Sequence, residues 1–464
     1  MPRWTAKAWL VVPALAALPA LALEPKWCLF YVAASFVLLP AAFLVGGAKL
    51  WLFLLCALSA FNFTKVVGGD ALQGAPGLGL LEFKAIDVPI LALLSFVAFR
   101  AVTQGGGQRL GPSARRALAV GGLFLAWAVV GAIGASRPDV VLVQSLQYVR
   151  LLLGLALVAA CASEAEDVAW GLAGLFLSLA GQTAIAVLQY LAGSSFGLYE
   201  HFEEDTAVGM LTRSGGTLNP TVLSEYIGIV APLALAAAFA SRRRWITAAL
   251  IALYGAAASA TVLTLSRGGI VSLALSTLVV VAWFGLRADQ PRTRKAMIAA
   301  AAAGFGVVLT GLFSDQVFAR FSDIAAEAEG GTGRLPQVKQ ALEMVVHHPL
   351  TGVGLGLYVD TMGQYGQALP YPVHNKFLGV TAETGIPGGI LYLCLWLFTL
   401  GAFVRRVLDR TRGEAILYAG GAAAVLATLV NMNTDVYSTG GAPELTLFLL
   451  AGLGLGHAGQ RVRA

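Results

Sequence analysis

Long apolar runs dominate this sequence and limit what it can fold into. The stretch LFLSLAGQTAIAVLQYLAG at 175–193 is one of many such runs, each 16 to 22 residues long with few charges. About 20 apolar residues in a helix cross a hydrocarbon core about 30 Å thick. With 12% charged residues, the chain has too little polar surface for a water-soluble globule. The alternating strands of a membrane barrel are absent, so we predict an all-α fold, a polytopic transmembrane helical bundle of about 12–14 spans.

Candidate spans occur along the whole chain. The first resembles a signal peptide, because Arg3 and Lys7 precede a short apolar run and Ala20-Leu21-Ala22 resembles a cleavage site. We favour an uncleaved anchor, since further spans follow at once. The candidates are 8–23, 27–46, 49–62, 86–101, 117–135, 140–160, 168–192, 219–240, 245–264, 268–286, 296–313, 376–404, 414–431 and 442–457.

The loop charges predict an orientation. If the N-terminus is cytoplasmic, the inside loops carry 20 of the 31 Lys and Arg residues, so the positive-inside rule puts both termini in the cytoplasm. The net charge of +6 then reports topology and implies no nucleic acid. We predict a multi-pass membrane protein with its site on the outer face, opposite both termini. Its parts are an N-terminal transmembrane region of about 11 candidate spans, a periplasmic loop with amphipathic helices and a C-terminal transmembrane region, at 1–313, 314–375 and 376–464.

Two arginines lie in or beside apolar segments, where charge is costly. Arg267, in TLSRGG, is followed by Gly268-Gly269, which lets a ligand approach the backbone at a helix N-terminus. The alternative for Arg267 is snorkelling at the interface. Arg150, in LQYVRLLLGL, lies within a span, where a charge costs at least ~2.5 kcal/mol on insertion scales. It is predicted to face a cavity or a partner, and structural pairing with Glu225 is the alternative.

Three more cations lie in the predicted outer loops. Arg213, in LTRSGGTLNP, precedes a span, and Arg334 opens an amphipathic helix that also carries Lys339. Arg213 and Arg334 also allow a solvated or capping role. Because guanidinium groups bind phosphate oxygens in a bidentate manner, we predict that these residues converge with Arg267 and Arg150 on a diphosphate.

His374 stands in VHNKFLGVTAETG, residues 373–385. An unbroken helix over 374–404 would be about 46 Å long, more than a hydrocarbon core of about 30 Å, so we expect a break at Gly385 and Pro387. Imidazole titrates near neutral pH, so we predict that His374 is a general base or an orienting group; the alternative is a satisfied interfacial histidine. The residues that would share a helix face with His374 are Leu378, Thr381 and Gly385.

GRLPQVKQALEMVVHHPLTGVGLGLY followed by HNKFLGVTAETGIPGG resembles the signature of the O-antigen ligase and polymerase superfamily. The resemblance is strongest over 334–389, with weaker support from SRGG and from the segment around Arg213. It implies a metal-independent, inverting glycosyltransferase of the GT-C type, with no cofactor. Its essential arginines are similar to Arg267 and Arg334, and its histidine to His374; Arg213, Arg150 and Lys339 are added from their placement alone.

The resemblance also implies the location and the partners. The location is a bacterial inner membrane, with the site on the periplasmic face. The donor is a glycan on undecaprenyl diphosphate, and the acceptor is lipid A-core or another glycan, reached within the lipid bilayer. O-antigen ligation in lipopolysaccharide biosynthesis is the leading hypothesis, because the 314–375 loop is compact. Repeat-unit polymerisation and protein O-oligosaccharyl transfer are the alternatives. A polyprenyl-linked glycan transporter is expected to show two related halves, which this sequence lacks. No metal site is predicted, since the acids of HFEED at 201–205 are typical of a solvated loop.

Overall fold

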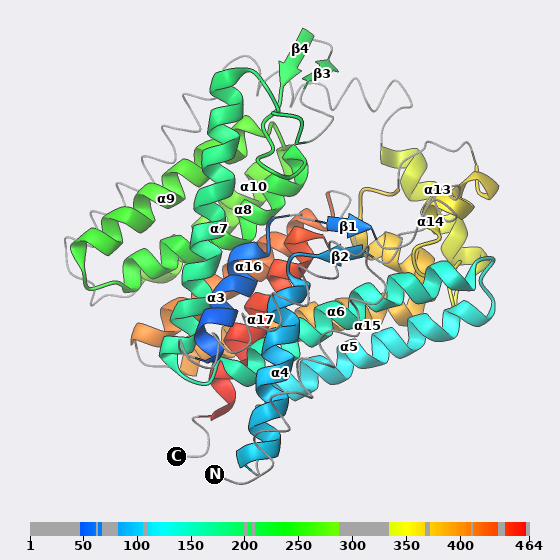
Figure 1. Cartoon of the computed structure of the whole chain (residues 1–464). Coiled ribbons are helices and arrows are strands. Elements are labelled where there is room, and N and C mark those ends of the chain that lie inside the picture. The colour runs from blue at the N-terminus through cyan, green and yellow to red at the C-terminus, as the bar shows by residue number, and fades with distance from the viewer. Residues whose placement is uncertain are drawn as a thin grey trace.

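The protein is a bundle of helices packed around one buried core (Figure 1). The structure, a computed structural model, describes residues 47–61, 64–66, 82–104, 110–198, 203–206, 209–286, 334–366, 372–409, 412–434 and 441–460. The predicted spans 8–23, 27–46 and 296–313 lie outside these residues. Each of the other eleven candidate spans contains a helix, and the all-α prediction is confirmed.

The helices closely follow the apolar runs. They are α3 (Ala48–Leu58), α4 (Asp87–Gln104), α5 (Pro112–Val130), α6 (Pro138–Cys161), α7 (Ala165–Ala192), α8 (Pro220–Ala240), α9 (Arg244–Leu263), α10 (Arg267–Leu286), α13 (Arg334–His347), α14 (Tyr358–Thr361), α15 (Lys376–Asp409), α16 (Arg412–Asn431) and α17 (Ala442–Gln460). Two short 3-10 turns, η3 (Gly131–Ile133) and η4 (Met362–Gln364), follow α5 and α14.

Two small antiparallel hairpins accompany the helices. Strand β1 (Thr64–Val66) pairs with β2 (Glu82–Lys84), and Thr64 lies opposite Lys84. Strand β3 (Glu203–Thr206) pairs with β4 (Gly209–Thr212), and Glu203 lies opposite Thr212. Both hairpins lie in loops between helices and leave the helical class unchanged.

Seven of the described helices are long and apolar enough to cross a membrane. They are α5, α6, α7, α8, α9, α10 and α15, and three shorter apolar segments lie in α3, α16 and α17. Helix α3 has 11 residues, which is about 16 Å, so by itself it is too short to cross a core of about 30 Å. The predicted span 49–62 is therefore only partly helical.

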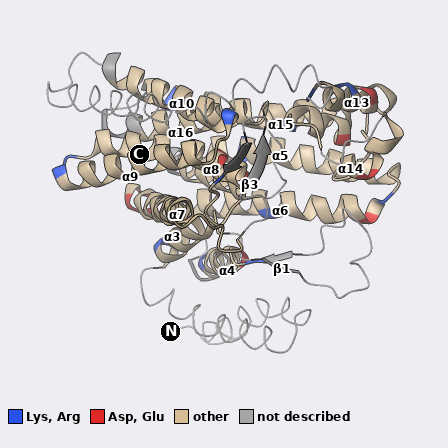
Figure 2. Cartoon of the chain, turned by 90° about the horizontal axis from the view of Figure 1, so that it is seen from above, with Lys and Arg blue, Asp and Glu red and all other residues tan. Residues whose placement is uncertain are grey.

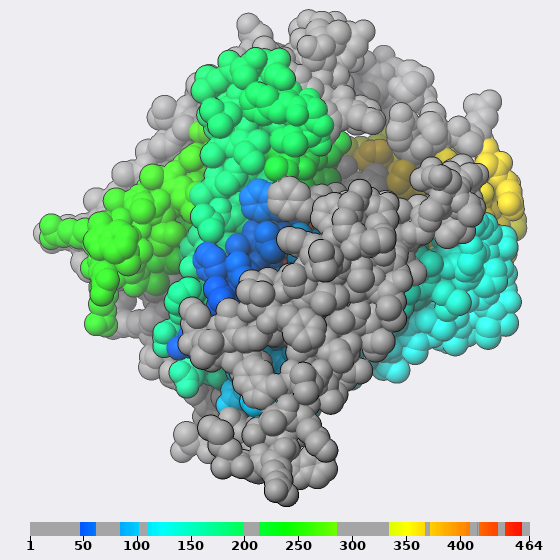
Figure 3. Space-filling view, viewed as in Figure 1, coloured from blue at the N-terminus to red at the C-terminus, as the bar shows by residue number. Residues whose placement is uncertain are grey.

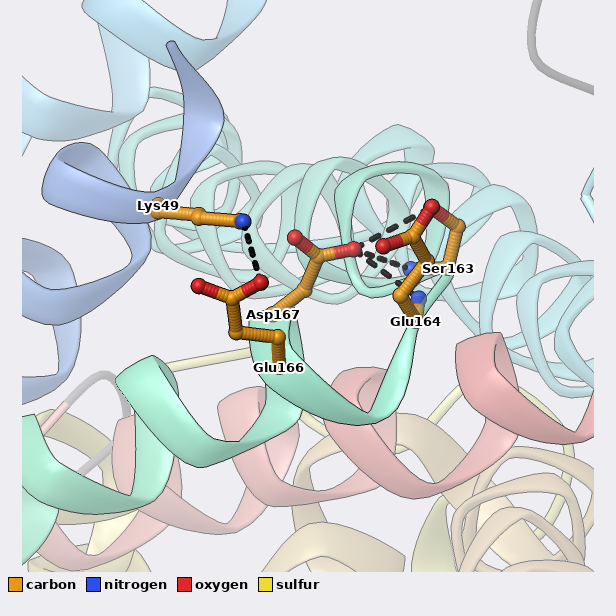
Figure 4. Close-up of polar contacts among 5 residues, drawn as sticks. All are labelled: Lys49, Ser163, Glu164, Glu166 and Asp167. Atoms are coloured by element: carbon orange, nitrogen blue, oxygen red, sulfur yellow. Dashed lines mark hydrogen bonds and ion pairs between the residues drawn. The ribbon is translucent and has the colours of Figure 1, made fainter. Parts of the chain in front are cut away.

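Local sequence signals set where the helices begin. Proline occupies the first helical position of α5, α6 and α8, where its missing N–H costs no hydrogen bond. At the start of α7, Glu164 and Asp167 form a capping box, and Lys49 of α3 pairs with Glu166 at 2.7 Å (Figure 4). These contacts fix the ends of α3 and α7 beside each other.

Connections that the sequence assigns to one side of the membrane contact each other in the structure. The turn after α5 and the segment that joins α13 to α14 lie together at one end of the molecule, cyan beside yellow in Figure 3. Arg137, between α5 and α6, lies 4.0 Å from Asp360 of α14. Charged residues lie mainly at helix ends, and the helices are uncharged over most of their length (Figure 2). This sorting agrees with the alternating topology; which side is periplasmic stays a prediction.

Helix α8 forms the centre of the bundle and is buried almost throughout. It packs against α9, α10 and α16, and α16 in turn packs against α10 and α15. This arrangement brings the ends of α8, α10, α15 and α16 close together, and the candidate site is built on those ends.

Candidate functional site

A break in α15 shapes one side of the candidate site. Gly385 has φ 73° and ψ 175°, so the helix stops there and restarts, as the sequence predicted. The turn between α13 and α14 fills the gap: Ile386 N–H donates to the Pro349 carbonyl at 2.8 Å, and Val353 N–H donates to the Ala382 carbonyl at 3.0 Å. The break is therefore a built feature whose backbone groups have partners.

Glycines make that close packing possible. A Cβ on Gly385 would fall on the carbonyl of Leu350, and a Cβ on Gly352 would fall on the backbone of Glu383. Gly352, Gly354 and Gly356 all have positive φ, a region that glycine adopts without strain. The GVGLG segment joins α13 to α14 and is docked on α15 by hydrogen bonds.

His374 lies two residues before α15, not within it. The helix begins at Lys376, and the side chain of Asn375 caps it by accepting the Leu378 N–H at 2.9 Å. Asparagine is a preferred capping residue, and this preference decides the start. The expectation that His374 shares a helical face with Leu378, Thr381 and Gly385 was therefore wrong.

The imidazole of His374 is held by α13. Its Nδ1 lies 2.8 Å from Oε1 of Gln337, and because that oxygen only accepts, Nδ1 carries the proton. In the neutral ring the lone pair that can take a proton is then on Nε2. Tyr358 Oη donates to the Gln337 carbonyl at 3.3 Å, and burial raises the pKa of Tyr358 to about 12, so the phenol stays a neutral donor.

Helix α13 carries two of the predicted phosphate ligands on different faces. Arg334 is its first residue and lies about 60° around the helix from Gln337, whereas Lys339 lies about 160° from Gln337. Gln337 is buried, and Arg334 and Lys339 are both exposed. The structure thus brings Arg334 to the side of α13 that holds His374 and puts Lys339 on the opposite side.

Arg267 opens α10 at a tight junction with α9. Leu265, between the two helices, has φ 52°, an uncommon left-handed conformation for a residue with a branched side chain. Ser266 caps α10 by accepting the Gly269 N–H at 3.2 Å. The junction projects Arg267, half-buried, at the positive end of a 20-residue helix.

Arg213 is fixed against the same junction. Its Nε donates to the Thr264 carbonyl at 2.9 Å, and its Nη2 donates to Thr221 Oγ1, on the first turn of α8, at 3.2 Å. Two buried glutamines of α7 hold the loop that follows: Gln189 accepts the Gly216 N–H at 2.9 Å, and Gln182 accepts the Thr217 N–H at 2.9 Å. Arg213 therefore joins α8 to the end of α9.

A turn that was not predicted from the sequence connects the segment of Arg267 to the segment of His374. This turn, residues 431–434, begins at the last residue of α16, and its Met432 carbonyl accepts the Lys376 N–H at 2.6 Å. Asn375 Nδ2 donates to Asn433 Oδ1 at 3.2 Å. On its other side the turn packs against α10, where a Cβ on Gly268 would lie 2.5 Å from Thr434 Oγ1. The polar run NMNT between two spans was the available signal.

Arg150 lies elsewhere and has a different partner from the one considered. Its Nε lies 2.9 Å from Oδ1 of Asp87 at the start of α4, and its Nη2 lies 3.2 Å from Oδ2. Gln147 accepts a further bond from Nη1 at 2.7 Å. A bidentate pair with a carboxylate satisfies a guanidinium in apolar surroundings, so the acid that pairs with Arg150 is Asp87, where Glu225 was the alternative considered.

The structure therefore brings together some of the predicted site residues and separates others. Hydrogen bonds and packing link the segments that carry Arg213, Arg267, Arg334 and His374, whereas Lys339 and Arg150 point to other surroundings. Guanidinium groups at a helix N-terminus are suited to bind an anion, and an imidazole with Nδ1 held is suited to take a proton at Nε2.

Most of these residues lie in a part of the chain that is similar to known proteins. Residues 252–393 match the family model described as O-antigen ligase. The chain is also similar to the "Exopolysaccharide production protein ExoQ" of Rhizobium meliloti (strain 1021), with 24% identity over 291 residues. That alignment covers 59% of this chain and 64% of ExoQ, so the chain spans less than two thirds of that relative. The matched range 252–393 contains Arg267, Arg334, His374 and the break at Gly385.

Proposed function

We propose that this protein is a membrane-embedded glycosyltransferase. It moves a glycan from undecaprenyl diphosphate to an acceptor hydroxyl on the periplasmic face of a bacterial inner membrane. The observation that carries the proposal is the hydrogen bond from His374 to Gln337, because it holds the helix of Arg334 against the histidine while the 431–434 turn joins that histidine to the start of α10. These contacts support one site that combines cations for a diphosphate with a base for a hydroxyl.

The arginines stabilise the leaving group. The bond from the anomeric carbon to the diphosphate oxygen breaks in the reaction, and negative charge grows on the diphosphate. Arg267 and Arg334 contact that charge, and the N-terminus of α10 adds its dipole. Arg213, fixed by Thr264 and Thr221, supports the junction that positions Arg267. Because guanidinium groups supply the positive charge, no divalent metal is needed.

His374 activates the acceptor. The acceptor oxygen forms the new bond to the anomeric carbon, and its proton passes to Nε2 of His374, while Gln337 holds Nδ1–H. Undecaprenyl diphosphate leaves from the opposite side, so the anomeric configuration inverts.

Ligation of O-antigen to lipid A-core is the leading form of this reaction, as the family description suggests. A second form is favoured by one observation: the relative ExoQ is named for exopolysaccharide production, which suits polymerisation of carrier-linked repeat units. The two forms differ in the acceptor and use the same donor chemistry.

One assay tests the proposal and separates its two forms. Purified protein receives undecaprenyl-diphosphate glycan together with either lipid A-core or a second carrier-linked glycan. A single ligated band with lipid A-core supports ligation, a ladder supports polymerisation, and no product with either acceptor contradicts a transferase. Turnover should persist in excess EDTA; loss that magnesium or manganese restores would contradict the arginine mechanism.

A further inference from the structure

Asn431 has an unsatisfied side chain in the middle of the protein. It is the last residue of α16 and is 1% exposed, and neither its Nδ2 nor its Oδ1 has a hydrogen-bond partner among the described residues. A buried amide without partners costs free energy, and nearly all buried polar groups in proteins are paired. An uncompensated amide at such a position requires an explanation.

The amide projects between α8 and the start of α10. A Cβ on Gly228 of α8 would lie 3.5 Å from Asn431 Nδ2, and a Cβ on Gly268 would lie 3.5 Å from Asn431 Oδ1. Gly268 directly follows Arg267 and is the second residue of α10. The side chain of Asn431 therefore lies beside the first turn of α10. That turn also carries Arg267, the proposed phosphate ligand.

This helix end is suited to an anion in its own right. The first turn of a helix directs its amide N–H groups beyond the helix end, and Ser266 accepts that of Gly269. An anion bound at this end meets these donors and the Arg267 side chain. Asn431 Nδ2 adds a further donor, and Oδ1 adds an acceptor that a bare phosphate leaves unfilled, because a fully ionised phosphate offers no hydrogen.

We propose that Asn431 is a binding residue for the glycosyl phosphate of the donor, an inference that rests on the proposed function. Nδ2 donates to an oxygen of the phosphate next to the sugar, and Oδ1 accepts from a hydroxyl of the first sugar. The junction of phosphate and sugar is the part of the donor that offers both kinds of group side by side. Asn431 is buried, so this contact requires the 431–434 turn and the first turn of α10 to separate and admit the donor.

The turn that begins at Asn431 also links the donor side of the proposed site to the acceptor side. The turn that begins at Asn431 bonds to Lys376 N–H and, through Asn433, to the side chain of Asn375 next to His374. Asn431 thus contacts the donor phosphate from the same turn that positions the base.

The test compares Asn431→Leu with the parent in two measurements. Binding of undecaprenyl-diphosphate glycan and of undecaprenyl diphosphate without glycan is measured first, and thermal unfolding in detergent second. We expect Asn431→Leu to bind the glycan-bearing carrier about tenfold more weakly than the parent does and to lose most of the preference for that carrier over the bare one. We also expect the variant to unfold at a temperature no lower than that of the parent. An unchanged affinity for both carriers would overturn the proposal, as would an unfolding temperature that falls while the carrier preference stays.

Two further variants complete the design. Asn431→Asp keeps the shape and adds a negative charge, so it should weaken both carriers; parental binding by this variant would also overturn the proposal, even if Asn431→Leu failed to fold. Thr428→Val is the matched control, because Thr428 lies one turn earlier on α16, is buried, and bonds only to the Ala424 carbonyl of its own helix at 2.9 Å among the described residues. Parent protein that binds glycan carrier but forms no product would contradict the proposed function and leave this binding test intact.

Discussion

Trp127 of α5 donates its indole N–H to the carbonyl of Thr384, 3.0 Å away, and to the carbonyl of Leu350, 3.2 Å away. Thr384 directly precedes the break in α15, and Leu350 belongs to the turn that docks there. One side chain therefore joins three segments that are up to 257 residues apart in sequence.

Replacing Trp127 with Phe should loosen this junction. The ring packing is largely kept and one donor is lost, so we expect about 1 kcal/mol of destabilisation and a several-fold slower transfer with donor binding unchanged. Thermal unfolding and steady-state kinetics measure the two effects. Trp245→Phe is the control, because Trp245 lies exposed at the start of α9; an equal effect of both variants would show that the indole N–H at Trp127 has no special role.

Gly385→Ala should be far more damaging than Gly401→Ala on the same helix. At Gly385 a Cβ would fall on the Leu350 carbonyl with φ at 73°, whereas a Cβ on Gly401 meets nothing within 4 Å. We expect the first variant to lose several kcal/mol of stability and its activity, and the second to behave as the parent or slightly better. Detergent-solubilised yield and the unfolding temperature are the measurements, and a parental Gly385→Ala would contradict the docked turn.

His374→Ala should separate chemistry from binding. We expect transfer to slow by about 10²–10⁴-fold with donor affinity nearly intact, since a positioned base contributes about that much. Gln337→Leu should lower kcat about tenfold and leave KM for the donor unchanged, because it removes the acceptor that holds Nδ1–H. A His374→Ala protein that inserts normally and transfers at the parental rate would remove the histidine from the mechanism.

Arg267→Ala and Arg334→Ala should weaken donor binding. Each charge-assisted contact to phosphate contributes about 1.5–3 kcal/mol, and lysine should rescue only in part because it lacks the planar fork. Lys339→Ala is the matched control on α13, since Lys339 lies exposed on the face away from Gln337. The measurement is the donor affinity of the three variants. Equal losses of affinity in the Arg334 and Lys339 variants would mean that the face of α13 on which a cation lies does not matter for donor binding.

The apolar runs and the glycine and proline positions in the sequence predicted most of the fold. Apolar runs located each described span to within a few residues, and Gly385 marked the break correctly. The start of α15 was missed because a single side-chain hydrogen bond, from Leu378 N–H to Asn375, decides it. The early end of α3 was not predicted, because an apolar run indicates burial and does not indicate where a helix stops.

The candidate site was harder to predict, because tertiary partners determine it. Asp87 as the partner of Arg150, and Gln337 as the partner of His374, lie 63 and 37 residues away in sequence, and no local pattern identifies them. The turn at 431–434 was missed for the same reason. Its asparagines resemble an ordinary polar loop until the ends of α10 and α15 are seen on either side of it.

The break in α15 has a consequence for how the protein is assembled. The carbonyls of Ala382 and Glu383 and the N–H of Ile386 bond to the 349–354 turn, and the Thr384 carbonyl bonds to Trp127. In an apolar medium such groups stay unsatisfied until those partners arrive. The helix therefore reaches its final shape only after the loop that precedes it has folded back onto α5. A chain in which the 349–354 turn has not docked therefore carries the arginines of the candidate site without the break that shapes one side of it.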